Sequence, residues 1–259
     1  MPPPSKVSTP IWNSTVLTTT LAPNDIVQSG PYIIQRCGSN SLRVKNDLDL
    51  IWSALQLAIT DTHYGTASPA YKTFFKDNIY AHFVAEIFKN ITTGASISKS
   101  NRHTPVSPSI TCLTTPGIAI ENTIAGPRDL YQICVHQPNR AGFYSYGTDW
   151  IFLCPSFFRL ESQPSIPLPG QTSPCPIFSN GQYQPHWSRL VVNQMYILMH
   201  EILHFYLDNA PGPVGDVMTE INEINAAVRL GTGATVSNAQ SYVFYAASKW
   251  VSMVASGVG

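Results

Sequence analysis

The segment from Arg189 to Leu207 constrains the fold most, because it predicts a helix with apolar side chains on almost every face. Such a helix is stable only when other elements cover it on all sides. Pro211-Gly212-Pro213 then ends it. We therefore expect a domain built around this helix, with the polar side chains of His200, Glu201 and His204 at positions where they need partners.

The rest of the chain predicts helices on both sides of a β-rich middle. Apolar spacing of three and four predicts helices over residues 46–60, 69–90, 217–230 and from 238 onward. Short β-rich runs at 110–113, 118–121, 130–136 and 150–153, separated by Gly and Pro turns, predict antiparallel strands or hairpins. The fold class is therefore α+β, mainly helical, with a small antiparallel or mixed sheet. Residues 1–30 are expected to form an extended arm and residues 31–259 one domain.

Charge is scarce in this chain. Fifteen basic and fifteen acidic residues cancel, and only 12% of the residues are charged, against about 25% in an average soluble domain. This excludes electrostatic binding of nucleic acid. No apolar run reaches the roughly 18 to 20 residues that span a bilayer, so we expect no membrane partner. A hydrophobic fraction of 44% is enough for one large core, and we expect a monomer.

The N-terminus and the polar residues bear on localisation. The first residues, Met1-Pro2-Pro3-Pro4, have neither the basic nor the apolar region of a signal peptide. Either the protein stays inside the cell, or a signal was removed. Two glycosylation sequons, at Asn13 and Asn90, and a polarity that comes from Ser, Thr and Asn favour a secreted protein.

The five cysteines form no C-x-x-C pair of the kind that binds structural zinc. Disulfides are the simpler use for them. We predict a Cys154–Cys175 bond, because it would close a loop rich in Pro and Gly. The pairing of Cys37, Cys112 and Cys134 is left open.

His200-Glu201-Ile202-Leu203-His204 is an H-E-x-x-H sequence inside the central helix. Residues four apart lie one turn apart on the same face, so both imidazoles can bind one Zn²⁺ ion. Glu201 lies further round the helix, where it can act as general base on a water. The alternative is a pair of core histidines without a metal, which would need partners that the nearby sequence does not supply.

A catalytic zinc ion needs a third protein ligand, and four acidic residues follow the motif. Asp208 lies on the same helix face but too far along the axis to reach the ion. Asp216 follows the Pro-Gly-Pro break, where a chain reversal can bring it back over the histidines. Glu220 and Glu223 share one face of the next predicted helix. The residues alone leave these alternatives open.

Several segments together resemble the aspzincin metallopeptidases, the deuterolysin and peptidyl-Lys endopeptidase group of fungi. They are the H-E-x-x-H motif, Gly215-Asp216, the segment from Asn238 to Tyr242, and the Cys-Pro and aromatic pair within 151–158. The resemblance covers about residues 130 to 250. It implies a zincin-like fold, His200, His204 and Asp216 as zinc ligands, and Glu201 as the base.

The sequence departs from this family at two positions. Thr219 stands where the family has a Tyr thought to stabilise the oxyanion, and Gln240 replaces an Asp. A different donor, Tyr242 or Tyr144, would then be needed, or activity is altered. The gluzincins instead use a later Glu as third ligand, and Glu223 has the corresponding spacing.

The sequence therefore predicts a secreted zinc endopeptidase that acts on peptides or proteins. In zincins an edge strand beside the active helix pairs with the substrate, and residues 141–147 are the candidate for it. The alternative is a non-catalytic secreted zinc-binding protein or effector on a peptidase scaffold. Glu201 favours catalysis and Thr219 favours the alternative. Cleavage specificity and zymogen status are not predicted.

Overall fold

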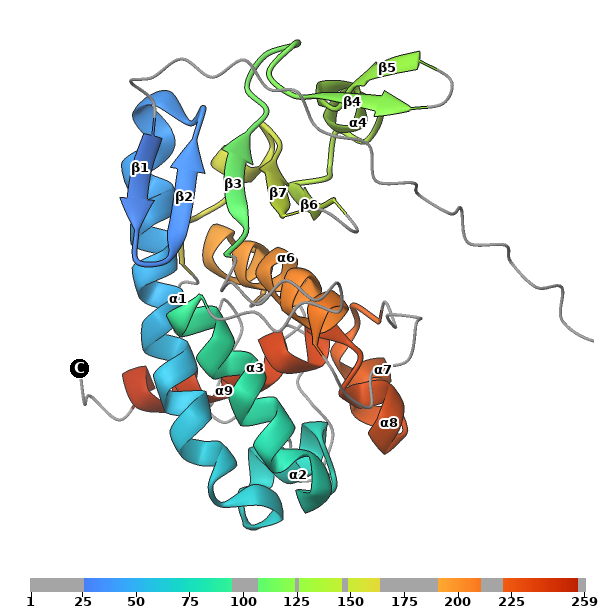
Figure 1. The fold of residues 1–259 in the computed structure, drawn as a ribbon. Helices are drawn as coiled ribbons and strands as arrows, with labels where there is room; N and C mark the ends of the chain where they lie inside the picture. The colour runs from blue at the N-terminus through green and yellow to red at the C-terminus, as the bar shows by residue number, and fades with distance from the viewer. Residues whose placement is uncertain are drawn as a thin grey trace, which may run out of the picture.

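The computed structural model describes residues 26–94, 107–123, 126–145, 149–163, 191–210 and 221–255. Helix α6 (Gln194–Asn209) lies in the middle, with a β-sheet on one side and a group of helices on the other (Figure 1). This α+β architecture was predicted from the sequence. None of the helices in the described ranges is long and apolar enough to cross a membrane.

Within the described residues, the main sheet has five strands in the order β1-β2-β3-β7-β6, so β6 lies at an edge of this part of the sheet. The strands are β1 (Ile26–Ser29), β2 (Tyr32–Gln35), β3 (Ser109–Cys112), β6 (Gly142–Tyr144) and β7 (Trp150–Leu153). Strand β1 contains the last residues of the predicted arm; residues 1–25 lie outside the described residues. A separate antiparallel hairpin consists of β4 (Ile120–Thr123) and β5 (Gly126–Asp129).

The sheet is mixed. Strand β3 pairs in parallel with both β2 and β7, while β1 with β2 and β6 with β7 are antiparallel. The prediction of antiparallel strands or hairpins was therefore wrong for β3, whereas the mixed sheet allowed by the predicted fold class is confirmed. Parallel neighbours need a long crossover, and the helices between β2 and β3 supply one.

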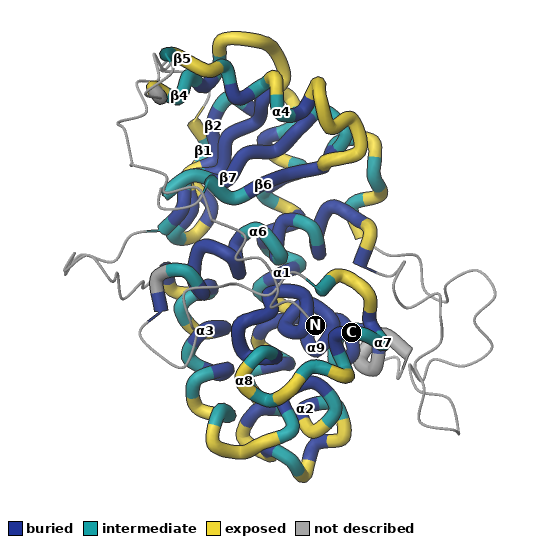
Figure 2. The backbone as a smooth tube through the Cα atoms, turned by 90° about the vertical axis from the view of Figure 1, so that its right-hand side faces the viewer, coloured by how far each residue is buried: buried dark blue, intermediate teal, exposed yellow. Residues whose placement is uncertain are grey.

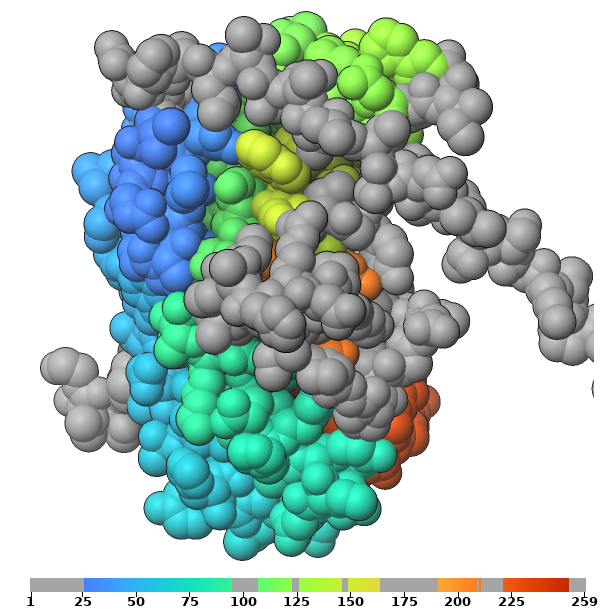
Figure 3. All heavy atoms as spheres, viewed as in Figure 1, coloured from blue at the N-terminus to red at the C-terminus, as the bar shows by residue number. Residues whose placement is uncertain are grey.

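Three helices form this crossover: α1 (Ser41–Thr62), α2 (Pro69–Phe74) and α3 (Ala81–Thr93). The space-filling view shows them as a continuous part of the surface on this side of the molecule (Figure 3). The remaining helices in the described part of the chain are α4 (Tyr131–His136), α7 (Ile224–Arg229), α8 (Thr232–Thr235) and α9 (Ala239–Ala255). Single 3₁₀ turns occur at Gly38–Asn40, Gly65–Ala67, Asn78–Tyr80 and Phe157–Arg159.

The helix predicted over residues 69–90 is two helices. Its start is as predicted, because the Ser68 side chain accepts a hydrogen bond from the Tyr71 N–H at 3.3 Å and Pro69 occupies the first turn. The break follows from Lys76, whose φ of 66° is incompatible with a continuous α-helix. Asp77 then accepts a hydrogen bond from the Ile79 N–H and begins the next turn.

The strand predicted over residues 130–136 is helix α4, so this prediction was wrong. The Asp129 carboxylate accepts a hydrogen bond from the Tyr131 N–H at 3.0 Å, which favours a helix start. Leu130 and Cys134 lie one turn apart and are both buried in a small core. This core covers the face of the sheet opposite α6 and includes Leu113, Ala119, Phe143 and Phe152.

The described residues form two disulfides, Cys37–Cys112 and Cys134–Cys154. The predicted Cys154–Cys175 bond was therefore wrong, and Cys175 lies outside the described residues. Cys154 instead ties the end of β7 to α4, which the sequence analysis did not recognise as a helix. The Cα atoms of this pair are 5.5 Å apart, within the range that a disulfide requires.

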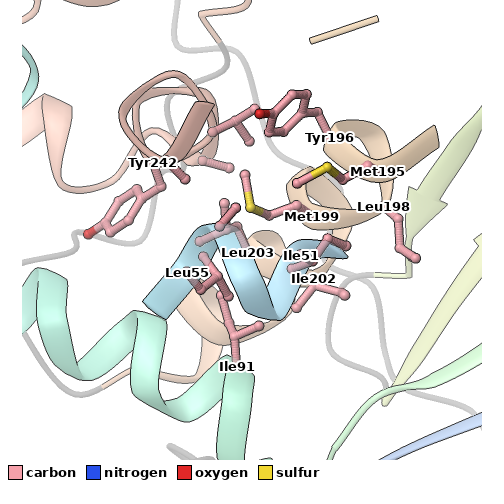
Figure 4. Close-up of a cluster of buried hydrophobic side chains, with 14 of the residues drawn as sticks. Ile51, Leu55, Ile91, Met195, Tyr196, Leu198, Met199, Ile202, Leu203 and Tyr242 are labelled. Carbon is pink, nitrogen blue, oxygen red and sulfur yellow. The ribbon is translucent and has the colours of Figure 1, made fainter. Parts of the chain in front are cut away.

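The main core surrounds α6, as expected for a helix with so few polar positions. Helices α1, α3 and α9 contact it, and their buried side chains meet those of α6 in Figure 4. The labelled members are Ile51, Leu55, Ile91, Met195, Tyr196, Leu198, Met199, Ile202, Leu203 and Tyr242. Figure 2 shows the buried positions concentrated along the strands and around α9.

Two fully buried tyrosines of this cluster, Tyr196 and Tyr242, differ in the hydrogen bonding of their hydroxyl groups. The Tyr242 hydroxyl donates a hydrogen bond to the Val236 carbonyl at 3.1 Å. The Tyr196 hydroxyl has no partner in the structure as described. Burial raises the pKa of both hydroxyls, so both remain protonated at ordinary pH.

The Tyr196→Phe substitution should therefore raise the free energy of unfolding by about 1 kcal/mol, because it removes a buried donor that forms no hydrogen bond. The matched Tyr242→Phe substitution should lower it by about 1 kcal/mol, because it leaves the Val236 carbonyl without its donor. Urea unfolding of both variants measures the difference. Destabilisation by Tyr196→Phe would show that this hydroxyl has a partner.

Candidate metal centre

His200 and His204 lie on the same face of α6, one helical turn apart. Their Nε2 atoms are 2.8 Å apart and the ring planes are nearly perpendicular, at 85°. His204 is 6% exposed and His200 is half-buried. Two neutral imidazoles can share one proton at this distance, whereas a divalent cation accepts both nitrogen lone pairs. The convergence of two Nε2 atoms fits a zinc-binding pair.

Glu201 lies beside this pair and contacts the sheet edge. Its Oε2 atom accepts a hydrogen bond from the Tyr144 N–H at 2.8 Å. Gly142 lies between β7 and Glu201. A Cβ atom there would lie 3.1 Å from the Phe152 carbonyl oxygen, a tight contact, and 3.5 Å from Glu201 Cγ, an ordinary one. The absence of a side chain at 142 therefore favours the close pairing of β6 with β7 beside the carboxylate.

Strand β6 directs its backbone groups alternately to β7 and to α6. On the inner side, the Cys154 N–H donates to the Ala141 carbonyl at 2.8 Å and the Ser145 N–H donates to the Trp150 carbonyl at 3.0 Å. The backbone groups of Gly142 and Tyr144 consequently point away from β7. This is the edge predicted at 141–147, of which residues 146 and 147 lie outside the described residues.

A cleft of about 750 Å³ lies between this edge and α6. Residues 137–144 form one wall, and His200, Glu201 and His204 lie on the other. An apolar stretch continues that second wall and consists of Val191, Val192, Tyr196 and Ile197. Among the described lining residues, Arg140 and Glu201 are the charged ones, and the uncharged amides are Gln137, Asn139, Asn222 and Gln240. The cleft therefore combines the imidazole pair, a carboxylate and a strand edge.

The predicted third ligand cannot be placed, because Asp216, Thr219 and Glu220 lie outside the described residues. Within the described part of the chain, no further His, Cys, Asp or Glu completes a three-ligand group. Glu223 serves as the N-cap of α7: its carboxylate accepts hydrogen bonds from the Asn225 N–H at 3.0 Å and the Ala226 N–H at 2.7 Å. Both of its oxygens are thus engaged away from the histidines.

The two tyrosines considered as oxyanion donors are also engaged elsewhere. Tyr242 packs in the core between Phe75 and Phe88, with its hydroxyl on Val236. The Tyr144 hydroxyl donates to Asp208 Oδ2 at 2.9 Å. Sequence reasoning did not anticipate the Tyr144–Asp208 contact, and no local pattern signals it because 64 positions separate the two residues.

No family model and no curated protein matches the sequence. A solved structure to which the chain is similar is that of a zinc peptidase from Grifola frondosa. The two share 13% sequence identity over 81% of this chain and 94% of that chain, with a TM-score of 0.46. The function of this chain is therefore inferred from its own residues.

Proposed function

We propose that this protein is a zinc-dependent endopeptidase of the aspzincin type. The observation that supports this most is the meeting of the His200 and His204 Nε2 atoms at 2.8 Å, beside the Glu201 carboxylate, in one cleft. His200 and His204 would hold the ion, with Asp216 as the third ligand. When bound, zinc polarises the scissile carbonyl and lowers the pKa of a water molecule.

Glu201 acts as the general base. Its carboxylate takes a proton from the attacking water and returns that proton to the leaving amine. The hydrogen bond from the Tyr144 N–H fixes the carboxylate on the cleft side of α6. A base held in this way needs no reorientation before proton transfer, which lowers the entropic cost of the step.

Strand β6 binds the substrate. An extended peptide can add to this edge through the backbone groups of Gly142, a mode that requires no charge on the protein, while the Tyr144 N–H stays on Glu201. The wall formed by Val191, Val192 and Ile197 favours apolar side chains in the bound peptide. We therefore expect unfolded proteins or extended peptides as substrates, without strong selection for charge.

Metal removal tests the proposal. Treatment with 1,10-phenanthroline should abolish cleavage of an unfolded protein substrate, and addition of one equivalent of zinc should restore it, because the imidazole pair alone supplies no Lewis acid. The measurement is the rate of appearance of new amino termini. If the zinc-loaded protein cleaves nothing in a broad peptide library, the endopeptidase proposal is wrong.

Two substitutions test which acidic residue is the third zinc ligand. Asp216→Ala should weaken zinc binding by more than about 100-fold, since losing a ligand costs more than losing an outer-shell partner. Glu223→Ala should leave zinc binding unchanged and lower the free energy of unfolding by about 1 kcal/mol through loss of the α7 cap. Competition with a chromogenic chelator measures the affinity. Retention of zinc by the Asp216 variant would refute the assignment.

A second candidate is a secreted protein that binds zinc without catalysis. Thr219 favours it, and so does the engagement of the Tyr144 and Tyr242 hydroxyls with Asp208 and Val236. Stoichiometric zinc without hydrolysis would identify this function. Under either proposal the protein is extracellular and monomeric, and the two disulfides are compatible with an oxidising compartment.

A further inference from the structure

Tyr144 contacts α6 through three different groups. Its backbone N–H donates to Glu201 Oε2 at 2.8 Å. Its ring meets the Phe205 ring edge-on, with centroids 5.9 Å apart. Its hydroxyl donates to Asp208 Oδ2 at 2.9 Å. One residue of the sheet edge is thus attached to the helix at three successive points.

The three contacted residues form a single stripe. Glu201, Phe205 and Asp208 are spaced by four and three, so they lie along one face of α6, next to the face that carries the imidazoles. The side chain of Tyr144 runs along this stripe toward the end of the helix. The hydroxyl contact with Asp208 is the outer attachment, and the amide contact with Glu201 is the inner one.

The outer attachment is the stronger of the two side-chain contacts. Asp208 and Tyr144 are both half-buried, and a hydrogen bond to a carboxylate is about twice as strong as one between neutral groups. This bond fixes the Tyr144 side chain, and with it the backbone at the end of β6. The amide that orients Glu201 belongs to the same residue.

We propose that Tyr144 and Asp208 are positioning residues that hold Glu201 in place through a clamp between β6 and α6. This inference rests on the proposed peptidase function for its kinetic consequences. Neither side chain needs to touch the substrate. When the clamp is lost, the Tyr144 amide is held less firmly against Glu201 and the base samples unproductive positions, which lowers the rate of the chemical step more than substrate binding.

Kinetics of three variants test the clamp. Tyr144→Phe and Asp208→Ala should each lower kcat about 10- to 100-fold with KM changed less than about threefold. Asp208→Asn should recover most of the loss, because its amide oxygen still accepts the tyrosine hydrogen bond. The Tyr144→Phe/Asp208→Ala double variant should be no slower than the slower single variant, since both remove one interaction.

Two substitutions on the surface serve as matched controls. Tyr64 is 65% exposed, and Asp49 pairs with Lys45 on the exposed side of α1. Tyr64→Phe and Asp49→Ala remove the same chemical groups outside the lining of the cleft. Both should leave kcat and KM unchanged.

Hydrogen exchange separates the clamp from the peptidase proposal. In the zinc-loaded full chain, the amides of residues 142–145 should exchange faster in Tyr144→Phe and in Asp208→Ala than in the wild type, and at the wild-type rate in Asp208→Asn. If the wild type hydrolyses no peptide, the peptidase proposal fails while exchange still tests the clamp. If Tyr144→Phe does not fold, the two Asp208 variants carry the comparison.

The clamp would be refuted by any of three results. The first is unchanged exchange at residues 142–145 in both disruptive variants. The second is a kcat within about twofold of the wild type in both, in an active enzyme. The third is a double variant whose loss equals the product of the single losses, because independent effects multiply.

Discussion

Glu201→Gln should lower the rate of peptide hydrolysis by about 10²- to 10⁴-fold while zinc remains bound. Glutamine keeps the size of the side chain and can still accept the Tyr144 hydrogen bond, but it cannot take a proton from water. Initial rates on an unfolded protein substrate, with the zinc content of the same preparation, check the prediction. Loss of rate without loss of zinc assigns the base.

His204→Ala is the matched control, because it should remove the zinc and the activity together. The two variants thus separate a failure of proton transfer from a failure of metal binding. A Glu201→Gln enzyme that keeps more than about a tenth of the wild-type rate would show that another group acts as base.

Removing the Cys37–Cys112 disulfide should have the largest effect on stability. The Cys37→Ser/Cys112→Ser variant should lose about 4.5 kcal/mol of unfolding free energy, because the bond closes a loop with a sequence separation of 75 residues. That loop contains the whole crossover from β2 through α1, α2 and α3 to β3. Denaturant unfolding of the oxidised protein and of the variant measures the difference.

The second disulfide is the internal reference. Cys134→Ser/Cys154→Ser should cost about 3.3 kcal/mol, because the sequence separation is only 20 residues. Both pairs are buried, so the losses of packing are similar. If removing the bond of the shorter loop cost as much unfolding free energy or more, the entropy of loop closure would not determine which disulfide stabilises the protein more.

Sequence reasoning succeeded where the signal was local. The spacing of apolar residues predicted α1, α6 and α9, and Ser68-Pro69 predicted the start of α2. Sequence reasoning failed where contacts between residues distant in the sequence determine the local structure. The run 130–136 is rich in β-branched and apolar residues, yet Asp129 and the bond from Cys134 to Cys154 favour a helix. The Cys37–Cys112 bond depends on the parallel pairing of β3 with β2, which no local pattern in the sequence reveals.

The candidate site also contains residues that local spacing predicts and residues whose contacts only the packing reveals. The sequence predicts that His200, Glu201 and His204 lie together, because their relative position depends only on helical spacing, and their roles stay a prediction. Tyr144 and Asp208 meet because β6 lies along α6, and no pattern within either segment predicts this contact. The constraint on Gly142 also emerges only from its close approach to the Phe152 carbonyl of β7.

The central place of α6 has a consequence for synthesis. Helix α9 covers one side of α6 and also contacts α1, so the first long helix meets the last one. During translation, α6 cannot bury the apolar side that α9 covers until residues beyond 239 have left the ribosome. The cleft between β6 and α6 therefore takes its final form only after α9 has been synthesised, which keeps nascent chains without α9 from presenting an ordered site to neighbouring proteins.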